Sequence, residues 1–140
     1  MGSETILVVD DEPGVQELVR IILSRQGYKI LVADSGPKAI EIYGQTGTAI
    51  DLLVTDVVMP GMSGIVLVQR LKAVNQELPV LFITGGTLAS LANFEFDPKC
   101  ALLRKPFDAQ SLVHSVRHVL DARRGNQTCT CRDTGSQSQP

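Results

Sequence analysis

The sequence contains no tryptophan, and aromatic residues make up only 4% of it, although 44% of its residues are hydrophobic. A core must therefore consist mainly of aliphatic side chains, which is typical of a sheet buried on both faces. No apolar run approaches the roughly 20 residues that a membrane-spanning helix needs. The first four residues also lack the basic and apolar regions of a secretory signal. We therefore expect a cytoplasmic protein with no membrane partner.

The chain also lacks a strong excess of charge and a complete set of zinc ligands. Its net charge is −2, which provides no positive surface for nucleic acid, so no direct nucleic-acid partner is expected. Cys100 stands alone, and Cys129 and Cys131 form a C-x-C pair in a segment without histidine. A structural zinc site needs four ligands, and we therefore expect none here.

Short aliphatic runs alternate with amphipathic segments along most of the chain. Aliphatic runs predict buried strands, and apolar residues at i, i+3, i+4 and i+7 predict helices. The predicted strands cover residues 5–10, 28–34, 50–56, 79–84 and 100–105. The predicted helices begin after Pro13, cover 37–44, begin near Gly64, cover 87–94 and begin after Asp108. Ser35 and Asp108 are expected to be N-caps.

This alternation predicts an α/β fold, because parallel neighbouring strands need crossover connections, which helices provide. We expect a doubly wound (βα)5 domain in three layers, with a five-stranded parallel sheet between two layers of helices. Residues 1–4 would form an N-terminal extension, and 5–124 the domain. Residues 125–140 are too polar to form a core and are expected to be a disordered tail.

Polar side chains follow the predicted strands. Asp10 and Asp11 follow the first strand, Asp56 ends the third, Thr84 the fourth and Lys105 the fifth. Ligands of open parallel sheets bind beyond these strand ends. Two carboxylates about 4 Å apart repel by about 4 kcal/mol at an effective dielectric near 20, so a cation is needed between them. Oxygen ligands on an open rim favour Mg²⁺.

With a cation in place, Asp56 can accept a phosphoryl group as an acyl phosphate. Lys105 would then bind one phosphate oxygen as a point charge, and Thr84 would donate a hydrogen bond to another. Each residue has a structural alternative: Asp11 as a helix N-cap, Asp56 in an Asx turn, Thr84 in a simple turn and Lys105 as a solvated charge. Their joint placement at successive strand ends favours the functional interpretation.

Four motifs resemble the receiver domain of two-component response regulators: ILVVDDEP, DLLVTDVVMPGMSG, VLFITG and LLRKPF, in this order and at similar spacing. The resemblance runs from about Glu4 to Ala122. It implies a flavodoxin-like strand order of 2-1-3-4-5. Receivers occur as separate regulators and within hybrid histidine kinases, and the opening ETILVVDDEP together with CALLRKPF resembles the hybrid-kinase type more.

The resemblance implies that Asp56 is the phosphoacceptor, Thr84 the switch hydroxyl and Lys105 the phosphate-binding lysine. The phosphoryl donor would be a phosphohistidine on a histidine kinase or a histidine phosphotransfer protein. Phosphorylation would switch a protein-interaction surface. The bond between Lys105 and Pro106 would be cis.

The resemblance also implies a magnesium site. Asp10 and Asp11 would form the acidic pair, and Mg²⁺ would be held by Asp11, Asp56 and the backbone carbonyl of Val58. The protein would promote only its own phosphorylation and dephosphorylation, and would not be an enzyme acting on another substrate.

Several positions depart from the family pattern. Leu103 stands where the family usually has an aromatic ring, so ring rotation cannot report phosphorylation here. Val58 and Gly86 offer no polar side chain that could orient an attacking water, so we expect a long-lived phosphoryl state. Gly85 replaces a small alanine, and the helix at 87–94 is expected to be short. We also expect a partner or homodimer surface on this helix, the fifth strand and the last helix.

Other functions are weighed against these residues. A pseudo-receiver would bind partners without phosphate, and only Leu103 favours it. A phosphatase would need a second acid at position 58, where the chain has valine. Neither common nucleotide-binding glycine motif occurs. His114 and His118 are spaced so that they could share a metal ion or act as phosphodonors, but a solvated helix face is the more economical interpretation because no third ligand is evident.

Overall fold

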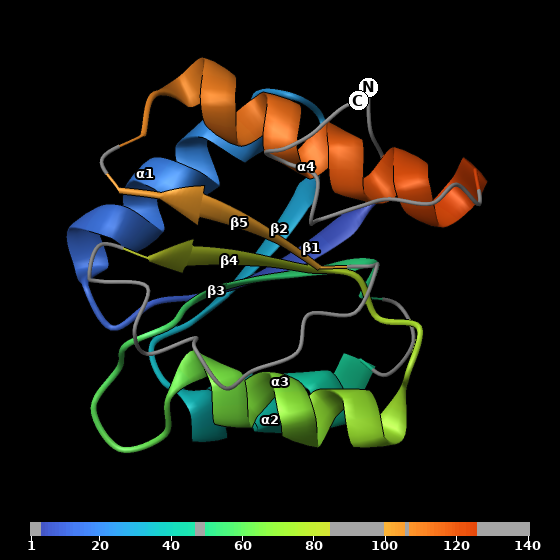
Figure 1. Cartoon of the computed structure of the whole chain (residues 1–140). Helices are drawn as coiled ribbons and strands as arrows, with labels where there is room; N and C mark the ends of the chain where they lie inside the picture. The colour runs from blue at the N-terminus through green and yellow to red at the C-terminus, as the bar shows by residue number, and fades with distance from the viewer. Residues whose placement is uncertain (1–3, 47–49, 85–99, 106, 126–140) are drawn as a thin grey trace.

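A computed structural model describes residues 4–46, 50–84, 100–105 and 107–125. Five strands form one sheet, and Figure 1 shows helices on both of its faces. The strands are β1 (Thr5–Val9), β2 (Lys29–Ala33), β3 (Leu52–Asp56), β4 (Val80–Thr84) and β5 (Cys100–Arg104). The helices are α1 (Pro13–Ser24), α2 (Gly36–Thr46), α3 (Gly64–Val74) and α4 (Ala109–Gly125). The helix predicted at 87–94 lies outside the described residues.

All neighbouring strands are parallel, and their order is β2-β1-β3-β4-β5. The predicted fold class and strand order are therefore confirmed. In the register of the sheet, Val9 pairs with both Ala33 and Thr55. Asp56 pairs with Ile83, one residue before the end of β4. The carboxyl ends of all five strands consequently lie along one edge.

Two aliphatic cores hold the helices against the sheet. In Figure 1, α1 and α4 cover one face, and α2 and α3 cover the other. The first core includes Ile6, Val8, Val19, Leu23, Leu81, Leu112 and Val116. The second includes Leu7, Val9, Leu53, Leu67, Val68 and Phe82. Burial of one such side chain contributes roughly 1.5–3 kcal/mol, and the cores hold the strand ends in place.

Capping side chains define where the helices begin. Ser35 accepts a hydrogen bond from the amide of Lys38 at 3.3 Å, and Asp108 accepts one from the amide of Ser111 at 2.8 Å. Both predicted N-caps are confirmed. The bond from Ser111 also lowers the pKa of Asp108, because it stabilises the carboxylate.

The observed strands are shorter than predicted by one or two residues. β1 ends at Val9, although the amide of Asp10 still donates to the carbonyl of Ala33 at 3.2 Å. Likewise β5 ends before Lys105. Asp10 and Lys105 thus lie just beyond the paired residues, whereas Asp56 and Thr84 are the last residues of β3 and β4. No described helix combines the length and apolar character needed to cross a bilayer.

Candidate functional site

Asp10 is held rigidly at the edge of the sheet by the loop after β1. Its carboxylate Oδ1 accepts a hydrogen bond from the amide of Glu12 at 2.9 Å. Its carbonyl accepts one from the side-chain amide of Gln16, in the second turn of α1. Only 2% of the surface of Asp10 is exposed. The loop therefore places a carboxylate at a buried position with little freedom to move.

The pKa of Asp10 lies above its ordinary value. Burial is the main cause, because a buried carboxylate loses hydration. The amide of Glu12 and the charge of Lys105 lower the pKa, whereas the charges of Asp56 and Asp11 raise it. The carboxylates at this edge are thus in an electrostatically unfavourable arrangement, which a bound cation would relieve.

Asp56 is the last residue of β3 and is 6% exposed. A tight connection to α3 fixes its backbone, because the amide of Gly64 donates to the carbonyl of Val57 at 2.8 Å. A Cβ atom on Gly64 would lie 2.0 Å from the carbonyl oxygen of Asp56. Only glycine allows so close an approach of two backbone segments.

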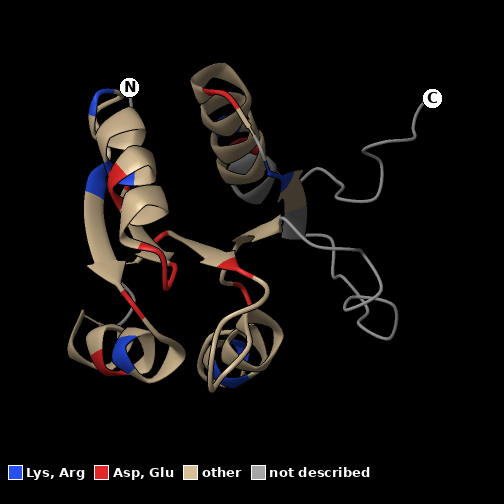
Figure 2. Ribbon diagram, turned by 90° about the vertical axis from the view of Figure 1, so that its left-hand side faces the viewer, with Lys and Arg blue, Asp and Glu red and all other residues tan. Residues whose placement is uncertain are grey.

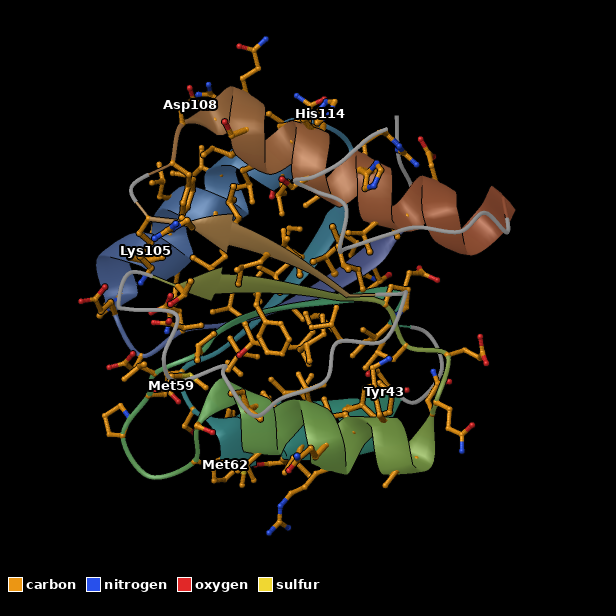
Figure 3. All side chains as sticks on the ribbon, in the orientation of Figure 1. Tyr43, Met59, Met62, Lys105, Asp108 and His114 are labelled. Atoms are coloured by element: carbon orange, nitrogen blue, oxygen red, sulfur yellow. The ribbon has the colours of Figure 1, made fainter. Side chains whose placement is uncertain are left out.

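The loop between β3 and α3 turns one apolar side chain outward. Met59 is buried, whereas Val58 is 61% exposed. Figure 3 shows Met59 and Met62 at the same end of the molecule as Lys105, and Tyr43 at the opposite end. Val58 therefore belongs to the solvent-facing rim of the candidate site.

Lys105 reaches from the end of β5 to carboxylates on other elements. Its amide donates to the carbonyl of Thr84 at 2.8 Å. Its Nζ lies 3.2 Å from Oδ2 of Asp56, 3.7 Å from Oδ2 of Asp10 and 3.7 Å from Oε1 of Glu12. Burial lowers the pKa of Lys105, but these three carboxylates raise it by more, so the net pKa is raised. The side chain is therefore a cation at neutral pH.

The carboxylates of Asp10, Asp11 and Asp56 form a cluster at this edge of the sheet. One oxygen each from Asp10, Asp11 and Asp56 lies within 4.8 Å of the other two, and no other group of this kind occurs among the described residues. Figure 2 looks onto this edge and shows acidic segments, in red, close together near its middle. Oxygen-only ligands with a net negative charge are what Mg²⁺ prefers. The residues present therefore fit such an ion.

Most of the predicted site residues come together. Asp10, Asp11 and Asp56 form the carboxylate cluster, and the ammonium group of Lys105 lies beside it. Thr84 is 1% exposed at the end of β4, next to the strand that carries Asp56. The carbonyl of Val58 as a metal ligand stays a prediction. Gly85, Gly86 and the peptide bond to Pro106 lie outside the described residues.

Two structural alternatives are wrong. The N-cap position of α1 is Glu12 and not Asp11, and it makes no side-chain capping bond. The side chain of Lys105 is only 21% exposed and is paired with carboxylates, so it is not a solvated charge.

Leu103 pairs with Ile83 and packs against the core under α1 and α4. His114 and His118 are exposed on α4, and the described residues provide no third ligand near them.

Sequence reasoning missed Glu12 and Gln16. The position of Glu12 directly after two acids could have drawn attention to it. Nothing in the sequence marks Gln16, because its contact with Asp10 depends on the angle at which α1 leaves the sheet.

Comparison with known proteins agrees with the fold described above. A family model described as the response regulator receiver domain matches residues 6–117. The chain is 35% identical to sensor kinase CckA of Brucella abortus, over 86% of this chain and 13% of that protein. It is 30% identical to sporulation initiation phosphotransferase F of Bacillus subtilis, over 86% and 96% of the two chains. A solved receiver protein from Sinorhizobium medicae is 30% identical, with a TM-score of 0.78 and coverage of 86% and 97%.

The chain spans a small part of the sensor kinase but nearly all of the phosphotransferase. Proteins of both kinds therefore contain a segment similar to it. Because the family model covers most of the sequence and the strand order agrees with solved receivers, this chain belongs to the family of response regulator receiver domains.

Proposed function

We propose that this receiver domain accepts a phosphoryl group on Asp56 from a phosphohistidine of a histidine kinase or a histidine phosphotransfer protein. Receiver domains are signalling modules that interact with such proteins. The observation that carries the proposal is the 3.2 Å contact between Nζ of Lys105 and Oδ2 of Asp56, at the edge of a three-carboxylate cluster. A lysine in this position can neutralise an arriving phosphoryl group.

Asp56 is the best placed of the three carboxylates to act as the nucleophile. Asp10 is nearly inaccessible, and its Oδ1 is occupied by the amide of Glu12. Asp11 is exposed, and it is not among the described ion-pair partners of Lys105. Asp56 combines the shortest contact to Lys105 with a second oxygen, Oδ1, to which the described residues donate no hydrogen bond.

In the transfer, a carboxylate oxygen of Asp56 attacks phosphorus in line with the nitrogen of the phosphohistidine. The new O–P bond forms as the P–N bond breaks, and the electron pair stays with the imidazole. Lys105 would pair with one phosphate oxygen, and Thr84 would donate its hydroxyl to another. Mg²⁺ held by Asp10, Asp11 and Asp56 would supply further positive charge for the phosphate oxygens.

A direct test is incubation with acetyl phosphate, with and without Mg²⁺, followed by intact-mass measurement. We expect the mass of one added phosphoryl group in the presence of Mg²⁺ and none in the Asp56→Asn variant. Transfer from a phosphorylated histidine phosphotransfer protein would then identify the donor class. Unchanged labelling of Asp56→Asn would exclude Asp56 as the acceptor.

The alternative is a pseudo-receiver that binds partners without phosphate. Leu103 favours it, because this aliphatic residue packs into the core and provides no aromatic ring at the surface. Absence of any mass gain in the wild type, together with unchanged partner binding by Asp56→Asn, would support this second function.

We also propose that the output surface includes β5 and the outer face of α4. β5 is an edge strand, and α4 packs beside it (Figure 1). The outer face of α4 exposes Gln110, His114, His118 and Asp121. Dimer formation through this surface would be detected by light scattering as a phosphorylation-dependent increase in mass. The cytoplasmic location and the lack of a nucleic-acid partner stay predictions from composition.

A further inference from the structure

Glu12 occupies the N-cap position of α1 but does not act as a cap. Its side chain makes no capping hydrogen bond, whereas serine, threonine, aspartate and asparagine are the residues that normally do so. Pro13 at the first helical position favours helix initiation without such a bond. The carboxylate of Glu12 is therefore not engaged in holding the helix.

The backbone of Glu12 is nevertheless fixed. Its amide donates to Oδ1 of Asp10 at 2.9 Å. Its carbonyl accepts hydrogen bonds from the amides of Val15 at 3.1 Å and Gln16 at 3.0 Å. The side chain thus projects from a rigid anchor at the edge of the site.

From this anchor the carboxylate reaches Lys105, with Oε1 3.7 Å from Nζ. The other two carboxylates around Lys105 are largely buried, because the side chains of Asp10 and Asp56 are only 3% and 8% exposed. The side chain of Glu12 is 62% exposed. Glu12 is therefore the solvent-side partner of the ammonium group, on the side from which a phosphodonor must arrive.

We propose that Glu12 is a positioning residue that restrains Lys105 in the unphosphorylated site and so limits the rate at which Asp56 is phosphorylated. The proposal rests on the proposed function of Asp56. During transfer, Lys105 must turn toward a phosphate oxygen. The contact with Glu12 has to weaken as it does so, which adds to the barrier. Exposed ion pairs are weak, so the effect is an adjustment of rate and not an on-off control.

The test uses acetyl phosphate at saturating Mg²⁺ and low salt, with the rate constant followed by intact mass. In this reaction a carboxylate oxygen of Asp56 attacks phosphorus, and the P–O bond to the departing acetate breaks. We expect Glu12→Gln to be phosphorylated about two- to fivefold faster than the wild type. At about 1 M salt, where the Debye length is about 3 Å, the difference should shrink. A purely structural effect would not respond to salt in this way.

Two further variants separate the contact from other effects. Glu17→Gln removes the same charge from α1 at an exposed position paired with Arg20, and it should leave the rate unchanged. Glu12→Asp keeps the charge but shortens the side chain by one methylene, so it should be accelerated like Glu12→Gln. Thermal unfolding of each variant verifies that the fold is retained.

Equal rates for Glu12→Gln and the wild type would overturn the inference while leaving the proposed function intact. Acceleration of Glu12→Gln with a wild-type rate for Glu12→Asp would also overturn it, because the charge would then repel the donor directly. No mass gain in any protein would overturn the proposed function and this inference together.

Discussion

The ammonium nitrogen of Lys105 lies 3.2 Å from Oδ2 of Asp56, although 49 positions separate the two residues in the chain. Asp56 ends β3 and Lys105 follows β5, so β4 lies between them in the sheet. The long side chain of lysine spans this intervening strand.

Replacing Lys105 by methionine keeps the length of the aliphatic stem but removes the ammonium group. Asp10 and Asp56 would stay buried without compensation, so the free energy of unfolding should fall by roughly 1–3 kcal/mol at about pH 7 without Mg²⁺. Urea unfolding measures the change. Lys29→Met, at an exposed position on β2, is the control and should change stability by less than about 0.5 kcal/mol. Equal losses in both variants would contradict the argument.

Asp10→Asn should gain stability relative to the wild type as the pH rises. The pKa of Asp10 is raised in the folded protein, so the folded state binds this proton more tightly than the unfolded state does. The resulting stabilisation is fully present below the ordinary pKa of about 3.9 and is lost as the pH rises through the folded pKa. Urea unfolding at about pH 3.5 and about pH 7 without Mg²⁺ tests this. A difference between the two proteins that does not vary with pH would disprove it.

Mg²⁺ should stabilise the folded domain by mass action. At a concentration 100 times the dissociation constant the gain is about 2.7 kcal/mol, and the melting temperature should rise by several degrees. Asp11→Asn should lose most of this gain, because it removes one of the three clustered carboxylates. Asp34→Asn removes an exposed acid just after β2, outside the cluster, and should keep it. An equal response of both variants to Mg²⁺ would rule out the cluster as the site.

Gly64→Ala should destabilise the domain and displace Asp56. The added Cβ would lie 2.0 Å from the carbonyl oxygen of Asp56, so the backbone must shift, at a cost of roughly 1–3 kcal/mol. The phosphorylation rate should fall as well. Gly44→Ala is the matched control, because a Cβ there meets no atom within 4 Å. In the helix α2 this change should stabilise by up to about 1 kcal/mol. Equal effects at the two glycines would show that the close approach is unimportant.

Val58→Asn should shorten the lifetime of phosphorylated Asp56. Val58 is exposed at the rim of the site and offers no group to orient a water molecule, whereas an asparagine amide can hydrogen-bond one. The decay of the phosphorylated protein is followed by intact mass. Val74→Asn is the control, because Val74 is also exposed but is the last residue of α3. This change should leave the lifetime unchanged. Slower decay in Val58→Asn than in the wild type would refute the prediction.

The sequence was sufficient to predict the sheet and most of the cluster, for a physical reason. Each aliphatic run must end where the chain leaves the core, so a polar residue such as Asp56 at the end of a run marks the sheet edge. Because parallel strands end on the same side, polar ends of neighbouring strands meet there. The predicted strands were one or two residues longer than the observed ones, because a run of apolar residues does not show where the pairing between strands stops.

The contacts of Glu12 and Gln16 could not be predicted in the same way. An N-cap is usually assigned from short polar residues, which directed attention to Asp11 and away from Glu12. The direction of a long side chain depends on the angle between α1 and β1, and that angle is set by packing between elements distant in sequence. Such packing leaves no periodic signal in the residues themselves.

The hydrogen bond from the amide of Lys105 to the carbonyl of Thr84 has a mechanical consequence. It joins the tips of β4 and β5 through the main chain, so a shift of one tip pulls the other with it. β5 borders the sheet, and a displacement that begins deep in the acidic rim would therefore be transmitted to the outer boundary of the molecule. This way of transmitting a displacement does not depend on the rotation of an aromatic side chain, and it would suit a chain that carries leucine at position 103.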